Sequence, residues 1–533
     1  MFSMNCFSRR SRLTTALLAA ACLLTLIITS ADALPPLRRR QPPVMDLDSY
    51  LPSWTPPNMD FPPTSANAAV KAAASSPTPL TTDEKPASAA DLLGQFLGSP
   101  SPSRARGTQG ASRYVVTMSK NISDADVQAH LSWLRTQLTT AIGDAQTADA
   151  IVGRFAGVVS TFKSSSGYTA QIPNWLVELV KGRKEVEHVE PDVYVSHFES
   201  RSSVNATNGI PITASGLLAT SSDDAKAQTL PPWGLDRISH REPGFEGLFI
   251  FPPEGGAGVD IYVLDTGIYS AHPEFQSRAK FGATFSPDGS TDGHGHGTHV
   301  AGTCASKTYG VAKKANVIGV KVLDNDGNGL ISQVVEGLDW VLGEVMKNTT
   351  RRSVINLSLG GAGKSEAINR LVSTLVENGV VLSVAAGNDN VDACTSSPAD
   401  SELVLTVGAS TKLDNRAPFS NYGDCVDIFA PGVNITSTYI PPHATRSLQG
   451  TSMSAPHVAG LMATLLSLYP TATPADIYTT ITTLATPQIV SDTKGGANRM
   501  LFSGLDNKPF DGLIKGKKNV PGMVWDFVKA FAT

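Results

Sequence analysis

Short apolar runs alternate with stretches of helical periodicity between about residues 228 and 503. The runs are rich in Val, Ile and Leu and span residues 259–264, 317–322, 354–357, 380–384 and 404–407. Helical spacing of apolar positions is found in residues 332–346 and 366–377. Continuous apolar strands separated by helices predict an α/β domain, with a parallel sheet covered by helices on both faces.

A smaller and different pattern precedes this region, in residues 113–197. A strand is expected at 114–118, followed by a helix that begins after Ser123, whose hydroxyl is suited to cap it. A second helix is expected around 175–180, and a strand-like run covers 186–195. These elements predict a small α+β domain ahead of the larger one.

Two segments lack a periodic apolar pattern. Residues 34–112 are rich in Pro, Ser and Ala, and we expect a disordered linker there. Residues 198–225 are small and polar, as in a hinge or cleavage region between two folded domains. The larger domain then occupies residues 226–505. A C-terminal extension, 506–533, ends in apolar residues that predict a short amphipathic helix.

The first 33 residues have the pattern of a secretory signal peptide. Three arginines within residues 9–12 precede an apolar run over 13–28, and A-D-A at 31–33 offers a cleavage site. The alternative is a membrane anchor, but the run is shorter than the roughly 20 apolar residues that a spanning helix needs. We therefore expect export, either to the extracellular space or to a vacuolar or lysosome-like lumen.

Charge and composition narrow the possible partners. The formal net charge of −4 over 533 residues gives no reason to expect binding to nucleic acid or to a membrane surface. Hydrophobic residues make up 41% of the chain, enough for a substantial core. The chain also contains 46 Gly and 35 Pro, which suits a loop-rich enzyme better than a coiled coil.

The chain contains five cysteines, of which Cys6 and Cys22 would leave with the signal peptide. Three remain, Cys304, Cys394 and Cys425. An odd number in an exported protein predicts one disulfide and one free thiol. Cysteine counting alone does not say which two are paired.

Two glycine-rich segments contain residue types suited to catalysis. D-T-G at 265–267 places an acid at the carboxyl end of a predicted strand, where sites form in open α/β sheets. Alone, such an acid is usually a cap or turn residue.

The second segment, G-H-G-H-G-T-H at 293–299, contains His294, His296 and His299, a cluster that is compatible with a metal site. The glycines on both sides of His296 indicate instead a close approach of the backbone.

A third segment, G-T-S-M-S-A-P-H-V-A-G at 450–460, begins an apolar helix that continues to residue 468. This helix is too hydrophobic for a surface position, so Ser452 is expected beside a buried core. On its own, a serine at a helix start is usually an N-cap. The free N–H groups and the dipole of the helix start would also stabilise an oxyanion.

Together the three segments resemble the subtilisin family of serine peptidases, in its proteinase K-like branch. Acid, histidine and serine follow the order Asp-His-Ser, one of the known triad orders. W-G-L-D-R-I at 233–238 resembles the start of the mature enzyme in that branch, and the resemblance spans about 227–503. It implies a subtilisin-like fold with Ser452 as nucleophile, His296 as its general base and Asp265 as the residue that orients His296. The other two histidines are then structural.

The resemblance also implies an oxyanion donor and a substrate cleft. V-A-A-G-N-D at 384–389 matches the family's oxyanion segment, with the Asn388 side chain and the Ser452 N–H as donors; elsewhere an Asn after Gly is usually a turn residue. Two segments around 323–329 and 358–361 look like edges that hold an extended peptide by backbone pairing. The substrate-binding positions are Gly327, Ser358, Leu359, Gly360, Ala385, Ala386 and Gly387. The last three would line the first specificity pocket, where small residues leave room for a large apolar or aromatic side chain.

Residues 113–197 resemble the inhibitor-type propeptide of this family, on Y-V-V at 114–116, H-L at 130–131 and V-E-P-D at 189–192. This implies a zymogen whose own propeptide assists folding, inhibits the enzyme and is removed by self-cleavage. Cleavage is expected near Ala225 or Lys226, although the long segment after Ser196 leaves earlier cuts open. The mature enzyme is expected to be a monomer that cuts protein and peptide substrates broadly.

Cysteine pairing is suggested by the same resemblance. Some proteinase K-like enzymes have cysteines in the segments that contain Cys394 and Cys425, which predicts a disulfide between them. Cys304 is then the free thiol, expected as a small buried residue.

A calcium site is a further expectation from the resemblance. V-D-I-F-A-P-G at 426–432 resembles a calcium-binding segment, with the Asp427 carboxylate and the carbonyl oxygens of Glu402 and Val404 as ligands. The alternative is that Asp427 caps a turn. Calcium would be structural, since the triad needs no cofactor for catalysis.

Two other classes of protein remain as alternatives. One is a catalytically silent binding protein on the same fold, and the other is a metal hydrolase built on the clustered histidines. A serine-directed reagent and a chelator would separate them, because only the serine peptidase is stopped by the first and spared by the second.

Overall fold

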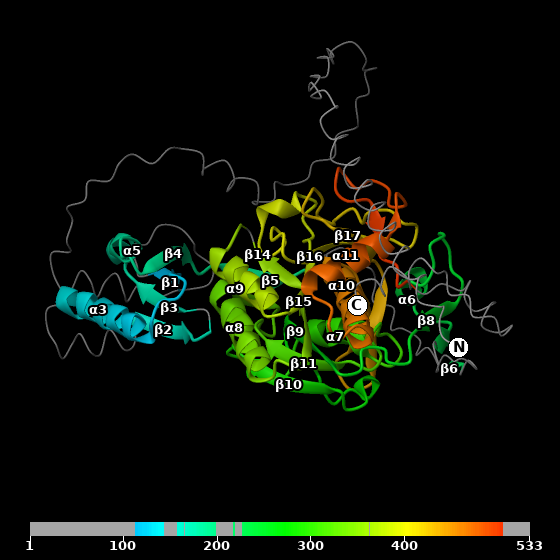
Figure 1. Cartoon of the computed structure of the whole chain (residues 1–533), viewed down its shortest axis with the longest axis horizontal. Coiled ribbons are helices and arrows are strands. Elements are labelled where there is room, and N and C mark those ends of the chain that lie inside the picture. The colour runs from blue at the N-terminus through cyan, green and yellow to red at the C-terminus, as the bar shows by residue number, and fades with distance from the viewer. Residues whose placement is uncertain are drawn as a thin grey trace, which may run out of the picture. The chain divides into compact units, whose positions relative to one another are not determined.

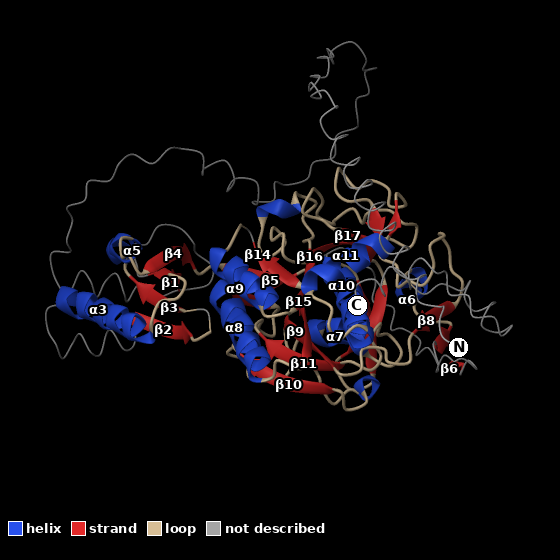
Figure 2. Ribbon diagram, viewed as in Figure 1, coloured by secondary structure: helices blue, strands red, loops and turns tan. Residues whose placement is uncertain are grey.

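The computed structural model describes residues 112–142, 157–164, 166–198, 217–218, 226–361 and 363–504 (Figures 1 and 2). The expected signal peptide, the linker at 34–111 and the C-terminal extension lie outside the described residues. No helix in the described part is long and apolar enough to cross a bilayer.

A nine-stranded sheet forms the centre of the larger domain. All neighbouring strands are parallel except the last two, which confirms the predicted parallel sheet. Their order across the sheet is β10 (Ala279–Thr284), β11 (Asn316–Lys321), β9 (Val259–Asp265), β13 (Arg352–Leu357), β15 (Val381–Ala385), β16 (Leu405–Ser410), β17 (Ile428–Pro431), β21 (Arg499–Met500) and β20 (Thr486–Pro487).

Helices cover both faces of this sheet, as the apolar strands require. Figure 1 shows α8 (Ile331–Lys347) and α9 (Glu366–Glu377) on one face, and α7 (His296–Ala305), α10 (Thr451–Leu468) and α11 (Pro474–Leu484) on the other. Successive residues of β9 enter opposite cores, since Ile261 packs on the α7 and α10 side and Tyr262 on the α8 and α9 side. Burial on both faces explains why the strands read as continuous apolar runs.

The N-terminal domain is the α+β unit that was expected, with two strands that the apolar pattern missed. Its antiparallel sheet has the order β2 (Gly157–Phe162), β3 (Gly167–Ile172), β1 (Ser112–Met118), β4 (Val186–Pro191), accompanied by α3 (Asp124–Ile142) and α5 (Asn174–Lys181). The Asp126 N–H donates to the Ser123 hydroxyl at 3.1 Å, which confirms the predicted cap.

The single strand expected at 186–195 is wrong. The chain leaves its own sheet after β4, and residues Tyr194–His197 form a separate strand, β5. β5 lies between β12 (Asn328–Leu330) and β14 (Leu359–Gly361) of the larger domain and is antiparallel to both. The break comes at Asp192, whose carboxylate accepts hydrogen bonds from the N–H and hydroxyl of Ser332 at the start of α8.

The remaining described elements lie at the edges of the larger domain. They are β6 (Leu217–Leu218), β7 (Lys226–Thr229), α6 (Trp233–Arg237), β8 (Leu248–Phe251), the short helices Pro273–Phe275 and Ala393–Thr395, β18 (Ile435–Tyr439) and β19 (Ala444–Leu448). A disulfide joins Cys394 to Cys425, whose Cα atoms are 5.3 Å apart, and Cys304 is a buried free thiol. Both expectations about the cysteines are confirmed.

Candidate active site

Asp265 and His296 are brought together by the end of β9 and the start of α7. The His296 Nδ1 lies 2.8 Å from Asp265 Oδ1, and both side chains are fully buried. Burial opposes ionisation of Asp265, but the His296 ring and the hydrogen bonds from His296 and the Thr266 N–H outweigh it and hold the pKa of this carboxyl below its ordinary value. The pair can therefore hold one ring tautomer of His296 and stabilise its protonated form.

Glycine is required on both sides of His296, as its flanking pattern indicated. Gly295 has a φ of 97°, and a side-chain carbon there would come within 2.5 Å of the Tyr439 ring. At Gly297 the same atom would lie 2.1 Å from the Gly267 carbonyl oxygen. The two glycines let the start of α7 press against neighbouring backbone and place His296 beside Asp265.

The buried carboxylate of Asp292 organises this loop and was missed in the sequence. Its Oδ1 accepts from the Gly295 N–H at 2.7 Å and from the Thr266 hydroxyl at 2.9 Å, while its Oδ2 accepts from the Thr298 N–H at 2.9 Å. The His294 N–H and the Thr298 hydroxyl add two further bonds. An Asp before Gly usually indicates a turn, but the N–H groups of a glycine-rich loop at a helix start need such an acceptor.

Ser452 lies in the first turn of α10, after Gly450 with a φ of 153°. Its hydroxyl donates to the Ser358 carbonyl oxygen at 2.9 Å and accepts from the Phe198 N–H at 3.1 Å. His296 Nε2, the ring nitrogen that a general base would use, is buried and has no hydrogen-bond partner among the described residues. The structure therefore shows Ser452 bonded to Ser358 rather than to His296.

Asn388 lies beside the start of α10 with its amide held in one orientation. Its Oδ1 accepts from the N–H and the hydroxyl of Thr451, both at 2.9 Å. Its Nδ2 therefore faces the opposite direction, where it donates to the Phe198 carbonyl oxygen at 2.6 Å. Thr451, a residue the sequence analysis did not single out, fixes the donor direction of Asn388.

The end of the N-terminal domain lies next to these residues, in a groove whose two edges are β12 and β14. The Phe198 ring is packed against the larger domain's core, and a side-chain carbon at Gly360 would come within 2.5 Å of it. His197 lies against Gly327, with its N–H donating to the Gly327 carbonyl oxygen at 3.1 Å and its Nδ1 3.0 Å from that oxygen. The His197 ring centroid is 4.7 Å from that of His296.

The seven positions expected to bind substrate fall into two groups in the structure. Gly327, Ser358, Leu359 and Gly360 flank the occupied groove, and backbone pairs such as Leu359↔His197 and Gly360↔Ser196 hold β5 there. Ala385, Ala386 and Gly387 continue β15 towards Asn388, and both alanines are fully buried. Gly387 has a φ of 104°, and a side chain there would collide with Asn421, so the backbone itself requires glycine.

The two other histidines of the G-H-G-H-G-T-H segment have different surroundings. His299 is fully buried and its Nε2 lies near two carbonyl oxygens, those of Ile435 and Arg446, a structural arrangement. The His294 ring faces His197, with centroids 4.6 Å apart, and burial lowers its pKa. Within the described ranges no group of three or more His, Cys, Asp or Glu side chains is arranged to hold a metal ion.

Two acids of the N-terminal domain bind helix starts of the larger domain. Glu190 accepts from the Ser365 hydroxyl at 2.7 Å and from the N–H groups of Glu366 and Ala367 at 3.1 and 3.2 Å, at the start of α9. Asp192 does the same at α8, where its two bonds to Ser332 are 2.8 and 2.7 Å. Carboxylates are favoured at helix N-termini, so these contacts hold the domain over the groove.

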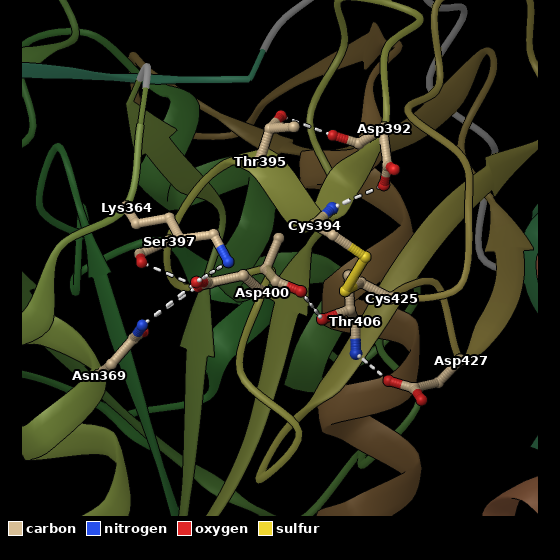
Figure 3. Close-up of a disulfide and its surroundings, with 11 residues drawn as sticks. Lys364, Asn369, Asp392, Cys394, Thr395, Ser397, Asp400, Thr406, Cys425 and Asp427 are labelled. Atoms are coloured by element: carbon tan, nitrogen blue, oxygen red, sulfur yellow. Dashed lines mark hydrogen bonds and ion pairs between the residues drawn. A yellow bond between two sulfur atoms is a disulfide. The ribbon is translucent and has the colours of Figure 1, made fainter.

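Asp427, the expected carboxylate ligand of calcium, lies near the disulfide (Figure 3). Asp427 is hydrogen bonded to Thr406, whose N–H donates to its carboxylate at 2.8 Å. Burial raises the pKa of Asp427 to about 6, against the opposing effects of that hydrogen bond and of Arg499. Val404 is buried, two residues before Thr406, and Glu402 is exposed.

Comparison with known proteins agrees with this architecture. The subtilase family model matches residues 256–504, and the peptidase inhibitor I9 model matches residues 113–197. A subtilisin-like protease of Coccidioides posadasii is 41% identical over 384 residues, covering 67% of this chain and 71% of the relative. A subtilisin-like serine protease of Penicillium citrinum is 38% identical over 411 residues, covering 71% and 84%. A solved cold adapted subtilisin-like serine proteinase is 41% identical over 52% of this chain and 99% of its own, with a TM-score of 0.49.

The fold, the site and these relatives define a serine endopeptidase preceded by an inhibitor domain. The chain belongs to the subtilase family, and its N-terminal domain is a propeptide of the I9 type.

Proposed function

We propose that this chain is an autoinhibited zymogen whose larger domain cuts peptide bonds through Asp265, His296 and Ser452. The observation that carries this proposal is the position of Phe198. Its carbonyl oxygen is 2.6 Å from Asn388 Nδ2 and its N–H is 3.1 Å from Ser452 Oγ. A peptide carbonyl between a nucleophile and an oxyanion donor is the arrangement that acyl transfer needs.

The reaction follows from these groups. Ser452 Oγ attacks the carbonyl carbon while its proton passes to His296 Nε2, which has no other partner among the described residues. Asp265 stabilises the imidazolium that forms, and Asn388 and the Ser452 N–H stabilise the oxyanion. His296 then gives the proton to the leaving amine, an acyl-enzyme remains, and water releases it by the same steps in reverse.

Substrate preference is proposed from the occupied groove. The Phe198 ring against Gly360 supports a pocket for large apolar or aromatic side chains. Pairing along β12 and β14 uses backbone groups that every residue has, which supports broad cleavage of proteins and peptides. In the zymogen the propeptide is both the inhibitor and the first occupant.

A structural calcium ion is part of the proposal, and the residues present fit it. Asp427 would supply the carboxylate, with carbonyl oxygens of Glu402 and Val404. The carboxylate is mostly buried, and its interactions with Thr406 and Arg499 do not offset the cost of burying its charge, so its pKa is raised. A cation with a preference for oxygen would offset that cost. No step of catalysis uses the ion.

Export by the signal peptide at 1–33 and a monomeric mature form complete the proposal. The residues proposed as triad and oxyanion donor all belong to the larger domain, which supports activity without a partner subunit. A destination in a vacuolar or lysosome-like lumen would use the same signal, and cell fractionation distinguishes the two.

The test is inhibition of the purified mature enzyme by a serine-directed phosphonate or sulfonyl reagent, together with Ser452→Ala. We expect the reagent to abolish hydrolysis of an aromatic peptide substrate and to modify Ser452 alone. Loss of activity with a chelator at low temperature, but not with the reagent, would support a metal hydrolase instead. A folded mature protein that hydrolyses nothing would indicate a silent binding protein.

A further inference from the structure

We infer that the enzyme first cuts its own precursor at the peptide bond after Phe198, so that residues 199–225 stay on the enzyme as its N-terminal segment. This inference rests on the proposed function, because the cut is made by the same Ser452. It replaces the cleavage near Ala225 or Lys226 that the sequence led us to expect.

The register of β5 directs one bond to the nucleophile. Tyr194, Val195 and Ser196 pair with β12, while Val195, Ser196 and His197 pair with β14 on the other side. The strand therefore enters the groove with its backbone fixed on both edges. The next residue, Phe198, has its N–H at Ser452 Oγ and, 3.4 Å away, at the Ser358 carbonyl oxygen.

The carbonyl at the oxyanion donor also belongs to Phe198. Asn388 Nδ2 donates to it at 2.6 Å, and Gly450 must be glycine because a side-chain carbon there would lie 2.1 Å from this oxygen. The Phe198 ring and the His197 ring occupy places where Gly360 and Gly327 leave room for them. The two ring positions, the backbone pairing and the carbonyl position therefore all indicate that the bond after Phe198 is the one that is cut.

The alternative cleavage point next to Lys226 is held away from the nucleophile. Lys226–Thr229 form β7, the central strand of a three-stranded sheet between β6 and β8. Ala227 and Gln228 are both 2% exposed. Placing a bond there in the groove would break both ladders and displace β5. A cut after Phe198 breaks none of these pairs.

The chemistry balances without any group beyond water. Ser452 Oγ bonds to the Phe198 carbonyl carbon, the C–N bond to residue 199 breaks, and the released amine takes the proton held by His296. Water then splits the ester and leaves the propeptide ending in a Phe198 carboxylate. β5 keeps its ladder pairs, so the cut propeptide still blocks the groove. The new N-terminus is at Glu199, and residues 199–225 stay covalently joined to the enzyme, where Leu217 and Leu218 pair with β7.

The experiment is a time course of the full-length precursor in a protease-deficient host, followed by intact mass and N-terminal sequencing. We expect the first large product to begin at Glu199 and a propeptide that ends at Phe198, ahead of any shorter species. A first large product beginning at residues 225–227, without any fragment ending at Phe198, would overturn the inference. A shorter species that appears only after the Glu199 product agrees with it.

Paired variants sharpen the test. Phe198→Asp should slow the first cut by about a hundredfold, because a charge must enter an apolar pocket, while Phe198→Tyr should be processed as wild type. Ala225→Asp is the matched control and should leave the first cut unchanged; the reverse pattern would overturn the inference. Ser452→Ala separates the two proposals. If Ser452→Ala is not cut and the wild type is cut at another bond, the proposed function stands and only the cleavage position after Phe198 is wrong. If Ser452→Ala is cut normally, both the proposed function and the cleavage position are wrong.

Discussion

The side-chain amide of Asn388 donates a 2.6 Å hydrogen bond to the carbonyl oxygen of Phe198, while its own oxygen is held by Thr451. An amide free to rotate could present either its oxygen or its nitrogen to a substrate. Here both bonds from Thr451 fix the oxygen, so the nitrogen must face the groove. The donor is therefore oriented before any charge develops, which is the condition for strong stabilisation of an oxyanion.

Asn388→Leu is expected to lower kcat by roughly 10²–10³-fold with little change in KM, the scale known for loss of one such donor in subtilisin. The leucine keeps the volume but removes the donor, together with the oxygen that accepts the two bonds from Thr451. Steady-state kinetics of the mature enzyme on an aromatic peptide substrate measures the effect. A comparable rise in KM without a loss of kcat would mean that Asn388 only binds substrate.

Asp292→Asn is expected to lower kcat by about tenfold or more. Both carboxylate oxygens accept N–H bonds from the loop around His296, and asparagine has only one acceptor oxygen, so at least one N–H loses its partner. The exposed Asp424→Asn is the control and should be silent. Unchanged kcat in Asp292→Asn would show that the Asp265–His296 contact holds the ring without this loop.

The three side chains proposed for catalysis stand out in the sequence because each is next to a change of pattern, and their roles were assigned by resemblance to the subtilisins. Asp265 ends an apolar strand, His296 begins a helix between glycines, and Ser452 lies at the start of a helix whose residues are nearly all buried. These are local signals. The parallel sheet could also be predicted from local signals, because its strands are buried on both faces and therefore contain few polar residues.

The groove's occupant could not be predicted in the same way. β5 looks like the continuation of β4, yet it pairs with strands more than a hundred residues further along the chain. What moves it is the bonding of Asp192 to Ser332, a contact between two domains. Apolar periodicity indicates that a strand is buried but not which strand it pairs with, so the sequence alone does not reveal that β5 pairs with β12 and β14.

Glu190→Gln is expected to weaken propeptide inhibition by about 10–100-fold. The buried carboxylate receives three bonds at the start of α9, and hydrogen bonds to a charged group contribute about 1.5–3 kcal/mol. The readout is the lag before activity appears after self-cleavage, which should shorten. Glu178→Gln is the matched control, because Glu178 makes an exposed ion pair with Lys181 and should leave the lag unchanged.

The propeptide is expected to lose stability below about pH 6.5. His130 is buried, with Nδ1 2.9 Å from Glu185 and Nε2 2.8 Å from the Tyr168 hydroxyl. Burial lowers its pKa below the ordinary value, against the opposing contact with Glu185. Folding therefore favours the neutral ring, and this stability is lost as the pH falls from the unfolded-state value towards the folded one.

The corresponding measurement is the lag before activity at pH 5 and pH 7.5. Wild type should show a shorter lag at pH 5, and His130→Gln should reduce the difference because glutamine does not titrate. An unchanged pH dependence in His130→Gln would place the titrating group elsewhere.

Calcium is expected to raise the melting temperature of the mature enzyme through Asp427. At a hundredfold excess over the dissociation constant, binding to the folded state alone stabilises by about 2.7 kcal/mol, or roughly 5–10 °C for a domain of this size. Asp427→Asn keeps an acceptor for the Thr406 N–H but removes the charge, so it should abolish most of the shift. The exposed Asp424→Asn, three residues earlier, should retain the calcium-dependent shift.

Because no step at Ser452 uses a metal, chelation should shorten the lifetime of the enzyme at high temperature and leave its activity at low temperature intact. Equal calcium-dependent shifts in wild type and Asp427→Asn would exclude this carboxylate as the ligand that matters.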